Sequence, residues 1–300
     1  MKAAIFLLAL LSFPIFAQSV RSITILTEPQ AKVWVNQVYR GETDNTGRLT
    51  INLPRQTIRI RVRAYGFKEL SKMVGPSQTG NVKFSLVRTT DKAELAFQQA
   101  EKMSSVDRER AVELYREAVS LKPNFAEAYV AMARVLSEMG ETEEALEAIK
   151  KARRIKPVYP EASAVEGRIY KSEGSEEKAI AAFNRAIKEG RGFQPEAYAG
   201  LGLLYKERAE SLSLEGKFDE EKLNYELAAK ALRTSINQLS GAPDAEALYQ
   251  VLGLIYEKQG KYPQAIKTYE EFLRVFPESS ERSAVESFIT QLKKKITEKN

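Results

Sequence analysis

The sequence of 300 residues contains no cysteine and no histidine. Without cysteine the chain can form no disulfide, thiol nucleophile or iron–sulfur cluster, and it cannot be lipid-anchored as a lipoprotein is. Without histidine it can assemble neither a Ser-His-Asp triad nor the usual catalytic zinc site. The spacing of a phosphate-binding or metal-binding loop is also missing. The composition therefore argues against an enzyme, and we expect no cofactor and no metal site.

A short hydrophobic segment opens the chain. Lys2 precedes an apolar run from Ala3 to Phe16, and Ala17 is a small residue directly before Gln18. This layout is typical of a secretory signal peptide, and the run is shorter than the roughly 20 apolar residues of a transmembrane helix. We interpret residues 1–17 as a signal peptide, with an uncleaved anchor as the alternative. We expect an exported protein that is periplasmic, envelope-associated or secreted, and no nucleic-acid partner.

Residues 18–90 have the pattern of short strands. Apolar and polar residues alternate in runs such as Ile58 to Arg63, and turn residues such as Gly41 and Gly47 separate the runs. Six or seven such strands predict a small antiparallel β-sandwich. The residues expected in its core are Trp34, Ile58, Ile60, Val62 and Phe84.

Two stretches of this region resemble the PEGA family of small β-sandwich domains. They are EPQAKVWVN, which starts at Glu28, and LPRQTIRIRVRAYGFKELSKMV, which starts at Leu53. The name-giving Pro-Glu-Gly-Ala is only partly matched by Pro29-Gln30-Ala31, whereas the later Gly-aromatic pair is matched by Gly66-Phe67. The resemblance implies an exported, envelope-associated domain that has a binding role and no catalytic one.

From residue 91 onward, small and aromatic residues recur in a longer pattern. One unit has Tyr129, Ala133, Leu136, Gly140, Ala145 and Ile149, followed 34 positions later by Ser163, Gly167, Tyr170, Gly174, Ala179 and Phe183. The pattern returns as Tyr249, Gly253, Tyr256, Gly260, Ala265 and Tyr269. A helix–turn–helix unit of this length resembles the tetratricopeptide repeat family, whose units stack into a superhelix because none can bury its apolar face alone.

This resemblance predicts an all-α solenoid after the β domain. We expect about five units over residues 91–279 and a capping helix over 280–300. The fourth unit is elongated, because its next landmark, Ala228, comes about 14 residues late. We place the extra segment near residues 206–227, in a longer helix pair that meets near Leu214 to Lys217. The fold class is thus multidomain α and β.

Charge is unevenly divided between the two parts. Residues 18–90 contain 12 Lys and Arg against 4 Asp and Glu, whereas residues 91–300 contain 33 against 36. Arg59, Arg61 and Arg63 alternate with apolar residues, so they leave the same face of one strand. This row suits an anionic glycan, a lipid headgroup or an acidic protein. The alternative is a solvated strand face without a ligand.

In tetratricopeptide proteins, fixed positions on the first helix of each unit line a concave groove. Carried over, these positions are Glu127, Val130, Arg134, Glu138, Glu161, Ala164, Arg168, Lys171, Glu196, Ala199, Leu203, Lys206, Gln250, Leu254 and Glu257. Arg134, Arg168 and Lys206 are expected to form a basic stripe for an extended acidic peptide. The alternative is that neighbouring glutamates neutralise them. The asparagine of the family's carboxylate clamp is missing from these positions, so we do not expect capture of a free C-terminus.

Two hypotheses remain open at this point. The first is a non-enzymatic scaffold of the bacterial cell envelope whose groove binds a protein or peptide partner. The second places the function in the basic β domain, which would bind an envelope glycan or an anionic lipid, with the repeats as a spacer.

Overall fold

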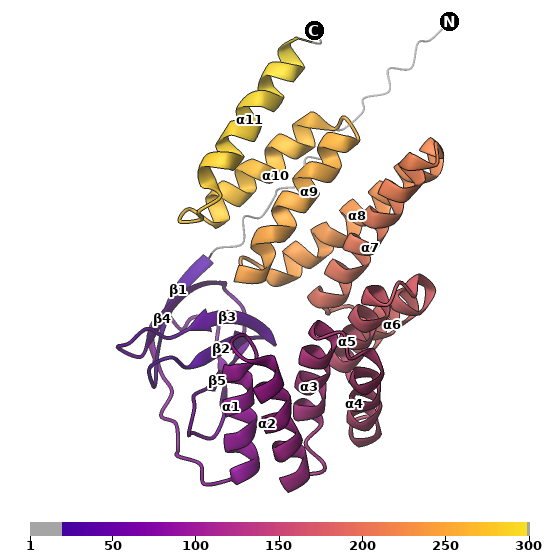
Figure 1. Ribbon diagram of the computed structural model, residues 1–300. Helices are drawn as coiled ribbons and strands as arrows, with labels where there is room; N and C mark the ends of the chain where they lie inside the picture. Colours follow the sequence, from indigo (N-terminus) through magenta and orange to yellow (C-terminus); the bar gives the residue numbers. More distant parts are fainter. Residues whose placement is uncertain (1–19, 299–300) are drawn as a thin grey trace, which may run out of the picture.

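The computed structural model describes residues 20–298, so the predicted signal peptide at 1–17 lies outside the described residues. The first part of the chain is a β region of two small sheets (Figure 1). The strands are β1 (Val20–Leu26), β2 (Lys32–Val35), β3 (Val38–Glu42), β4 (Arg48–Pro54), β5 (Ile58–Arg63), β6 (Leu70–Val74) and β7 (Gly80–Lys83). Their order is β4-β1-β7 in one sheet and β3-β2-β5-β6 in the other.

The expectation of a wholly antiparallel sandwich is wrong for one pair of strands. β7 runs parallel to β1, with Ile23 opposite Gly80, whereas the other paired strands are antiparallel. The reason lies in the connection. The chain leaves β6 in the four-stranded sheet, crosses to the other sheet, and joins β1 from the side that β4 leaves free.

The two sheets enclose one apolar core. Ile58, Ile60, Val62 and Phe84 are buried in it, as predicted. Trp34 is not: on β2 the neighbours Val33 and Val35 point into the core, and alternation along the strand puts Trp34 on the opposite face, where it is half-buried. The prediction of Trp34 as a core residue was therefore wrong.

The second part of the chain is helical and consists of stacked helix pairs (Figure 1). The pairs are α1 (Lys92–Met103) with α2 (Arg108–Leu121), α3 (Ala126–Glu138) with α4 (Thr142–Ile155), α5 (Pro160–Ser172) with α6 (Glu176–Glu189), α7 (Pro195–Leu214) with α8 (Phe218–Leu239), and α9 (Glu246–Lys258) with α10 (Tyr262–Val275). A short 3-10 helix, η1 (Pro243–Ala245), precedes α9. The fourth pair has the longest helices of the described chain, with 20 residues in α7 and 22 in α8, and its turn lies between Leu214 and Phe218.

Small residues allow the helices to cross closely. The ring of Phe183 on α6 lies between Gly167 on α5 and Gly200 on α7, and a Cβ added at Gly167 would come within 2.5 Å of that ring. Gly253 on α9 faces the ring of Tyr269 on α10 in the same way. The recurring glycine of the sequence pattern is thus explained by a large side chain from the second helix that fills the space above it.

The last helix, α11 (Arg282–Thr297), covers the end of the stack. It buries Val285, Ile289 and Leu292 against α10, while Phe288 stays 42% exposed. Within residues 20–298, no helix combines the length and the hydrophobicity needed to cross a membrane.

Candidate functional site at the inner face of the helices

One face of the first helices meets the β region. The guanidinium group of Arg63, on β5, donates a hydrogen bond of 2.8 Å to Glu127 on α3 and one of 3.0 Å to Glu101 on α1. It also donates one of 2.6 Å to Glu69 within the β region. The Arg63 side chain is only 5% exposed. Three carboxylates therefore surround one buried cation where the two parts of the chain join.

The neighbouring arginine extends this contact. Arg61 donates a 3.3 Å hydrogen bond to Glu127, and its guanidinium lies 4.1 Å from the centre of the Trp34 ring. Such cation–π contacts strengthen as the cation loses water. The structure corrects the expectation of a free basic strand face. Arg63 is buried and Arg61 is half-buried because acidic side chains cover them, and only Arg59 remains exposed.

The opposite charges of this cluster stabilise one another's ionised forms. Burial disfavours the charged form of Arg63, but the three nearby carboxylates outweigh it and raise its pKa above the usual range. Burial likewise opposes ionisation of Glu127, yet the guanidinium groups of Arg63 and Arg61 keep the pKa of Glu127 below its usual value. Both groups are therefore held in their charged forms.

A second contact joins the β region to the far end of the fourth unit. Val38, on β3, packs into the core formed by the end of α8, η1 and α9. Next to it, Arg40 donates a 2.8 Å hydrogen bond to the carbonyl of Ser240, at the C-terminus of α8. A cation is favourable at that end of the helix dipole. Burial lowers the pKa of Arg40 to about 10. The β region thus touches the helices at two separate places (Figure 1).

Between these contacts, the inner face carries paired charges. Arg134, on α3, donates two hydrogen bonds of 2.5 Å to the two carboxylate oxygens of Glu196 on α7. Arg168, on α5, pairs with Glu196 at 3.3 Å and with Glu138 at 3.7 Å. Although burial opposes ionisation of Glu196, the two arginines keep its pKa below the usual value. Glutamates therefore neutralise this part of the expected basic stripe.

The remaining lysines of the inner face are paired as well. Lys206 pairs with Glu210 at 2.7 Å, and Lys171 pairs with Glu207 at 2.6 Å. The expectation of a free basic stripe at Arg134, Arg168 and Lys206 was therefore wrong, because each cation has an acidic partner on its own helix or on another unit.

The other expected groove positions differ in how accessible they are. Val130 is buried among helices, so it cannot meet a partner. Glu161 is half-buried, and one of its carboxylate oxygens is buried without a hydrogen bond. Leu203 and Gln250 are half-buried, and Leu254 is 42% exposed. The accessible uncharged positions of the inner face therefore lie on α7 and α9, whereas Arg168 and Glu138, which are 40% and 41% exposed, are held in ion pairs.

Sequence reasoning missed the residues that join the two parts. Glu69, Glu101 and Arg40 had no motif, and Trp34 was assigned to the core. The opposite charge balance of the two parts was the available signal, because a basic domain and a mildly acidic one in the same chain can neutralise each other.

Acidic side chains such as those of the inner face can act as metal ligands, acids or bases. Within residues 20–298, no group of three or more acidic side chains is arranged to hold a metal ion. The carboxylates with shifted pKa values at the inner face, Glu127 and Glu196, are paired with arginine. Pairing with arginine holds these two carboxylates in their charged forms.

Comparisons with known proteins identify repeats in the helical part. Family models described as tetratricopeptide repeat match residues 103–169, 161–189 and 246–279. Yeast Tom70 resembles the chain with a TM-score of 0.55 at 15% identity, over 69% of this chain and 41% of Tom70. TTC0263, a thermophilic TPR protein of Thermus thermophilus, has a TM-score of 0.49 at 18% identity, over 66% and 99%. MamA has a TM-score of 0.44 at 21% identity, over 63% and 94%.

A search of curated protein sequences finds no match to the chain. The matching family models are all repeats, and they indicate no catalytic family. Repeats of this kind present extended surfaces to other proteins, which indicates a protein-interaction scaffold. Residues 103–189 and 246–279 of the helical part therefore match tetratricopeptide repeats.

Proposed function

We propose that the chain is a non-enzymatic, exported scaffold that binds a protein or peptide partner of the bacterial cell envelope. The partner binds at the inner face of α7 and α9. The support comes from one position that recurs in four successive units and is occupied by Arg134, Arg168, Leu203 and Leu254. The two arginines are paired with glutamates, whereas Leu254 is 42% exposed.

The side chains of this surface indicate which kind of partner segment it can bind. Its lysines, Lys171 and Lys206, are paired with glutamates, so a strongly acidic peptide would have to compete with Glu207 and Glu210 for them. Leu203, Leu254 and Gln250 instead suit an apolar side chain flanked by groups that form hydrogen bonds. The partner segment is therefore expected to be amphipathic rather than acidic.

The β region contributes by fixing the position of the helices. It contacts α1 and α3 through Arg63 and the end of α8 through Val38 and Arg40. We propose that it is a PEGA-like domain that braces the repeats and orients them at the envelope. Export is proposed from the layout of residues 1–17. Intact-mass measurement of the exported protein tests it, with cleavage expected between Ala17 and Gln18.

The partner surface is tested by photo-crosslinking in cells. A photoreactive residue replaces Leu254 on α9, and in a matched control it replaces Leu121, which is 50% exposed at the end of α2. A discrete crosslinked partner in the exported fraction is expected from position 254 and not from position 121. Equal crosslinking at both positions, or none at 254, would remove this surface from the proposal.

The alternative, binding of an anionic glycan or lipid by the β region, has less support. Two of the three arginines on β5, Arg61 and Arg63, are engaged with Glu127. Arg59 alone is a weak anion site, because an exposed charge is screened by salt. Salt-sensitive binding of the full chain to anionic vesicles that is lost in Arg59→Ala would revive this alternative.

A further inference from the structure

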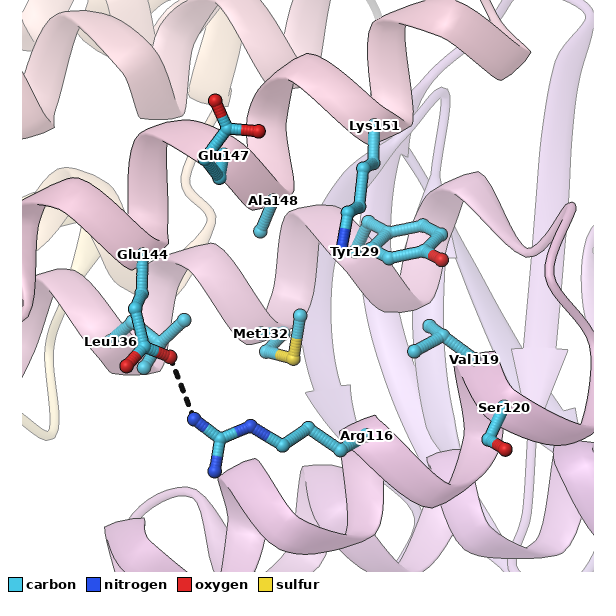
Figure 2. Close-up of a pocket in the computed structure, with 10 residues that line it drawn as sticks. All are labelled: Arg116, Val119, Ser120, Tyr129, Met132, Leu136, Glu144, Glu147, Ala148 and Lys151. Atoms are coloured by element: carbon cyan, nitrogen blue, oxygen red, sulfur yellow. Dashed lines mark hydrogen bonds and ion pairs between the residues drawn. The ribbon is translucent and has the colours of Figure 1, made fainter.

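A groove lies on the other side of the helices, between α2, α3 and α4 (Figure 2). Its volume is about 430 Å³. Tyr129, Met132 and Leu136 of α3 line it, and with 100° of rotation per residue these positions lie opposite Glu127 and Arg134. The remaining lining residues are Arg116, Val119, Ser120, Glu144, Glu147, Ala148 and Lys151. The groove is therefore separate from the inner face and from the β region.

Equivalent places at two of the three later junctions between units are filled by ion pairs. Thirty-four residues on from the groove, Arg153 pairs with Glu189 at 2.8 Å, and Ser163 donates a 2.7 Å hydrogen bond to Glu189. Arg185 pairs with Glu166 in the same cluster.

The junction between the last two units is also filled by an ion pair, which different residues form. Arg233 pairs with Glu271 at 2.7 Å, and Tyr249 donates a 2.9 Å hydrogen bond to the same glutamate. At both of these junctions, a carboxylate holds the second helices and the first helix of the next unit together.

At the groove, these carboxylates are missing. The positions that correspond to Glu166 and Glu189 are Met132 and Ile155. Arg116 turns instead to Glu144 at one edge of the groove, a 2.7 Å pair that Figure 2 shows. Lys151 lies 5.8 Å from the centre of the Tyr129 ring and forms no ion pair within residues 20–298. The groove thus combines an apolar floor with a cation that is not engaged in a salt bridge of the described chain.

The complementary surface is the tip of the elongated α7–α8 pair, which projects beyond the neighbouring helices (Figure 1). Leu214 is 91% exposed and Phe218 is 69% exposed at this tip. The next three residues are Asp219, Glu220 and Glu221, and none of them forms an ion pair among the described residues. The tip therefore presents large apolar side chains next to carboxylates that are available for a cation, whereas the groove's own carboxylates, Glu144 and Glu147, are already paired with Arg116 and Lys150.

We propose that the α7–α8 tip of one copy of the chain inserts into the α2–α3–α4 groove of a second copy. Phe218 then covers Val119, which is half-buried, above the buried side chain of Met132, and the carboxylates that follow Phe218 pair with Lys151. Because the tip and the groove are different surfaces, a joined pair keeps one tip and one groove free. Such a heterologous contact grows into open chains or closes into a ring, according to its rotation. The proposal does not depend on a partner at the inner face.

The test is sedimentation velocity of the exported protein over a range of concentrations. The wild-type chain is expected to show concentration-dependent association. Phe218→Ser at the tip and Lys151→Glu in the groove are each expected to weaken it about tenfold or more, because each removes a central contact. Both side chains are exposed, so folding is expected to be unchanged in circular dichroism. Val158→Ser, at a residue 63% exposed elsewhere, serves as the control and should associate as wild type does.

A mixture of the two variants tests the contact between tip and groove more directly than either variant alone. Phe218→Ser keeps an intact groove and Lys151→Glu keeps an intact tip, so the mixture is expected to form one-to-one pairs that cannot grow further. A wild-type chain that stays monomeric overturns the proposal, and so do variants that associate as wild type does or a mixture that fails to pair. A groove that instead serves a different protein would appear here as a monomeric wild-type chain.

Discussion

Arg63 on strand β5 and Glu127 on helix α3 form a 2.8 Å hydrogen-bonded ion pair that joins the β region to the repeats. Glu127 is an inner-face position of its repeat, so the pair occupies surface that a partner could otherwise use. The basic strand and the first part of the groove are therefore one intramolecular contact rather than two binding sites. This leaves the inner face of α7 and α9 as the accessible part.

Replacing the buried arginine is expected to destabilise the protein. Arg63→Ala leaves Glu101 without its cation, and it leaves Glu69 and Glu127 with Arg61 alone. We expect a loss of about 2–3 kcal/mol in the free energy of unfolding, below the ~3–5 kcal/mol of fully buried pairs because the carboxylates remain partly solvated. Arg59→Ala, on the same strand but exposed, should change it by less than about 0.5 kcal/mol. Denaturant unfolding compares the two, and equal effects would contradict a specific role for Arg63.

The same pair predicts a dependence on pH. The pKa of Glu127 in the folded chain lies below that of an unfolded glutamate, about 4.3. The stabilisation is therefore fully present above that value and is lost as the pH falls through the folded pKa. Glu127→Gln should reduce the free energy of unfolding at pH 7, and this difference from wild type should shrink as the pH falls through the folded pKa of Glu127. Unfolding curves across this range test it, and a variant that stays parallel to wild type at every pH would contradict it.

At one helix crossing, we expect alanine to destabilise the protein relative to glycine, although alanine has the higher helix propensity. In an open helix, Gly→Ala stabilises by up to about 1 kcal/mol. At Gly167 the added methyl group meets the ring of Phe183, so overpacking outweighs this gain and Gly167→Ala should destabilise by about 1–2 kcal/mol. Phe183→Leu creates room, so the double variant should cost less than the sum of the two single ones. Additive losses in thermal unfolding would show that the two residues do not interact.

Sequence patterns predicted the repeats well because the packing that defines them is local. Gly167, Gly253 and their partners Phe183 and Tyr269 recur at fixed spacing, since each helix pair must solve the same packing problem. The turn of the elongated unit could also be located from the sequence, because the late position of Ala228 shows how much longer its helices are. The contact between the β region and the helices could not, because it joins residues 64 positions apart, Arg63 and Glu127, and no local period connects them.

Alternation along a strand shows which side chains share a face, but it does not show what covers that face. Arg59, Arg61 and Arg63 do share one, yet Arg63 is buried and Arg59 is exposed, because α1 and α3 cover one end of the strand only. The prediction that the charged groove positions are free to bind a partner was wrong for a related reason. Arg134 and Arg168 were identified by position, but pairing with Glu196 depends on how the units curve toward one another.

Trp34, the single tryptophan of the chain, provides a direct reporter of the docked β region. It lies under the guanidinium of Arg61 at 4.1 Å, on the face of β2 that points away from the β core. Glu127→Arg places a like charge against Arg61 and Arg63 and should separate the β region from α3. Trp34 would then gain water contact, so its fluorescence should shift to longer wavelength while the far-ultraviolet circular dichroism stays that of folded sheets and helices.

The matched control is Glu113→Arg on α2, where the glutamate is exposed and pairs only with Arg110 on the same helix. It changes the net charge by the same amount and should leave the emission of Trp34 where it is in wild type. A red shift in both variants would indicate a general effect of charge. An unshifted spectrum in Glu127→Arg would mean that the β region is held by its second contact, at Val38 and Arg40, without the pair at Arg63.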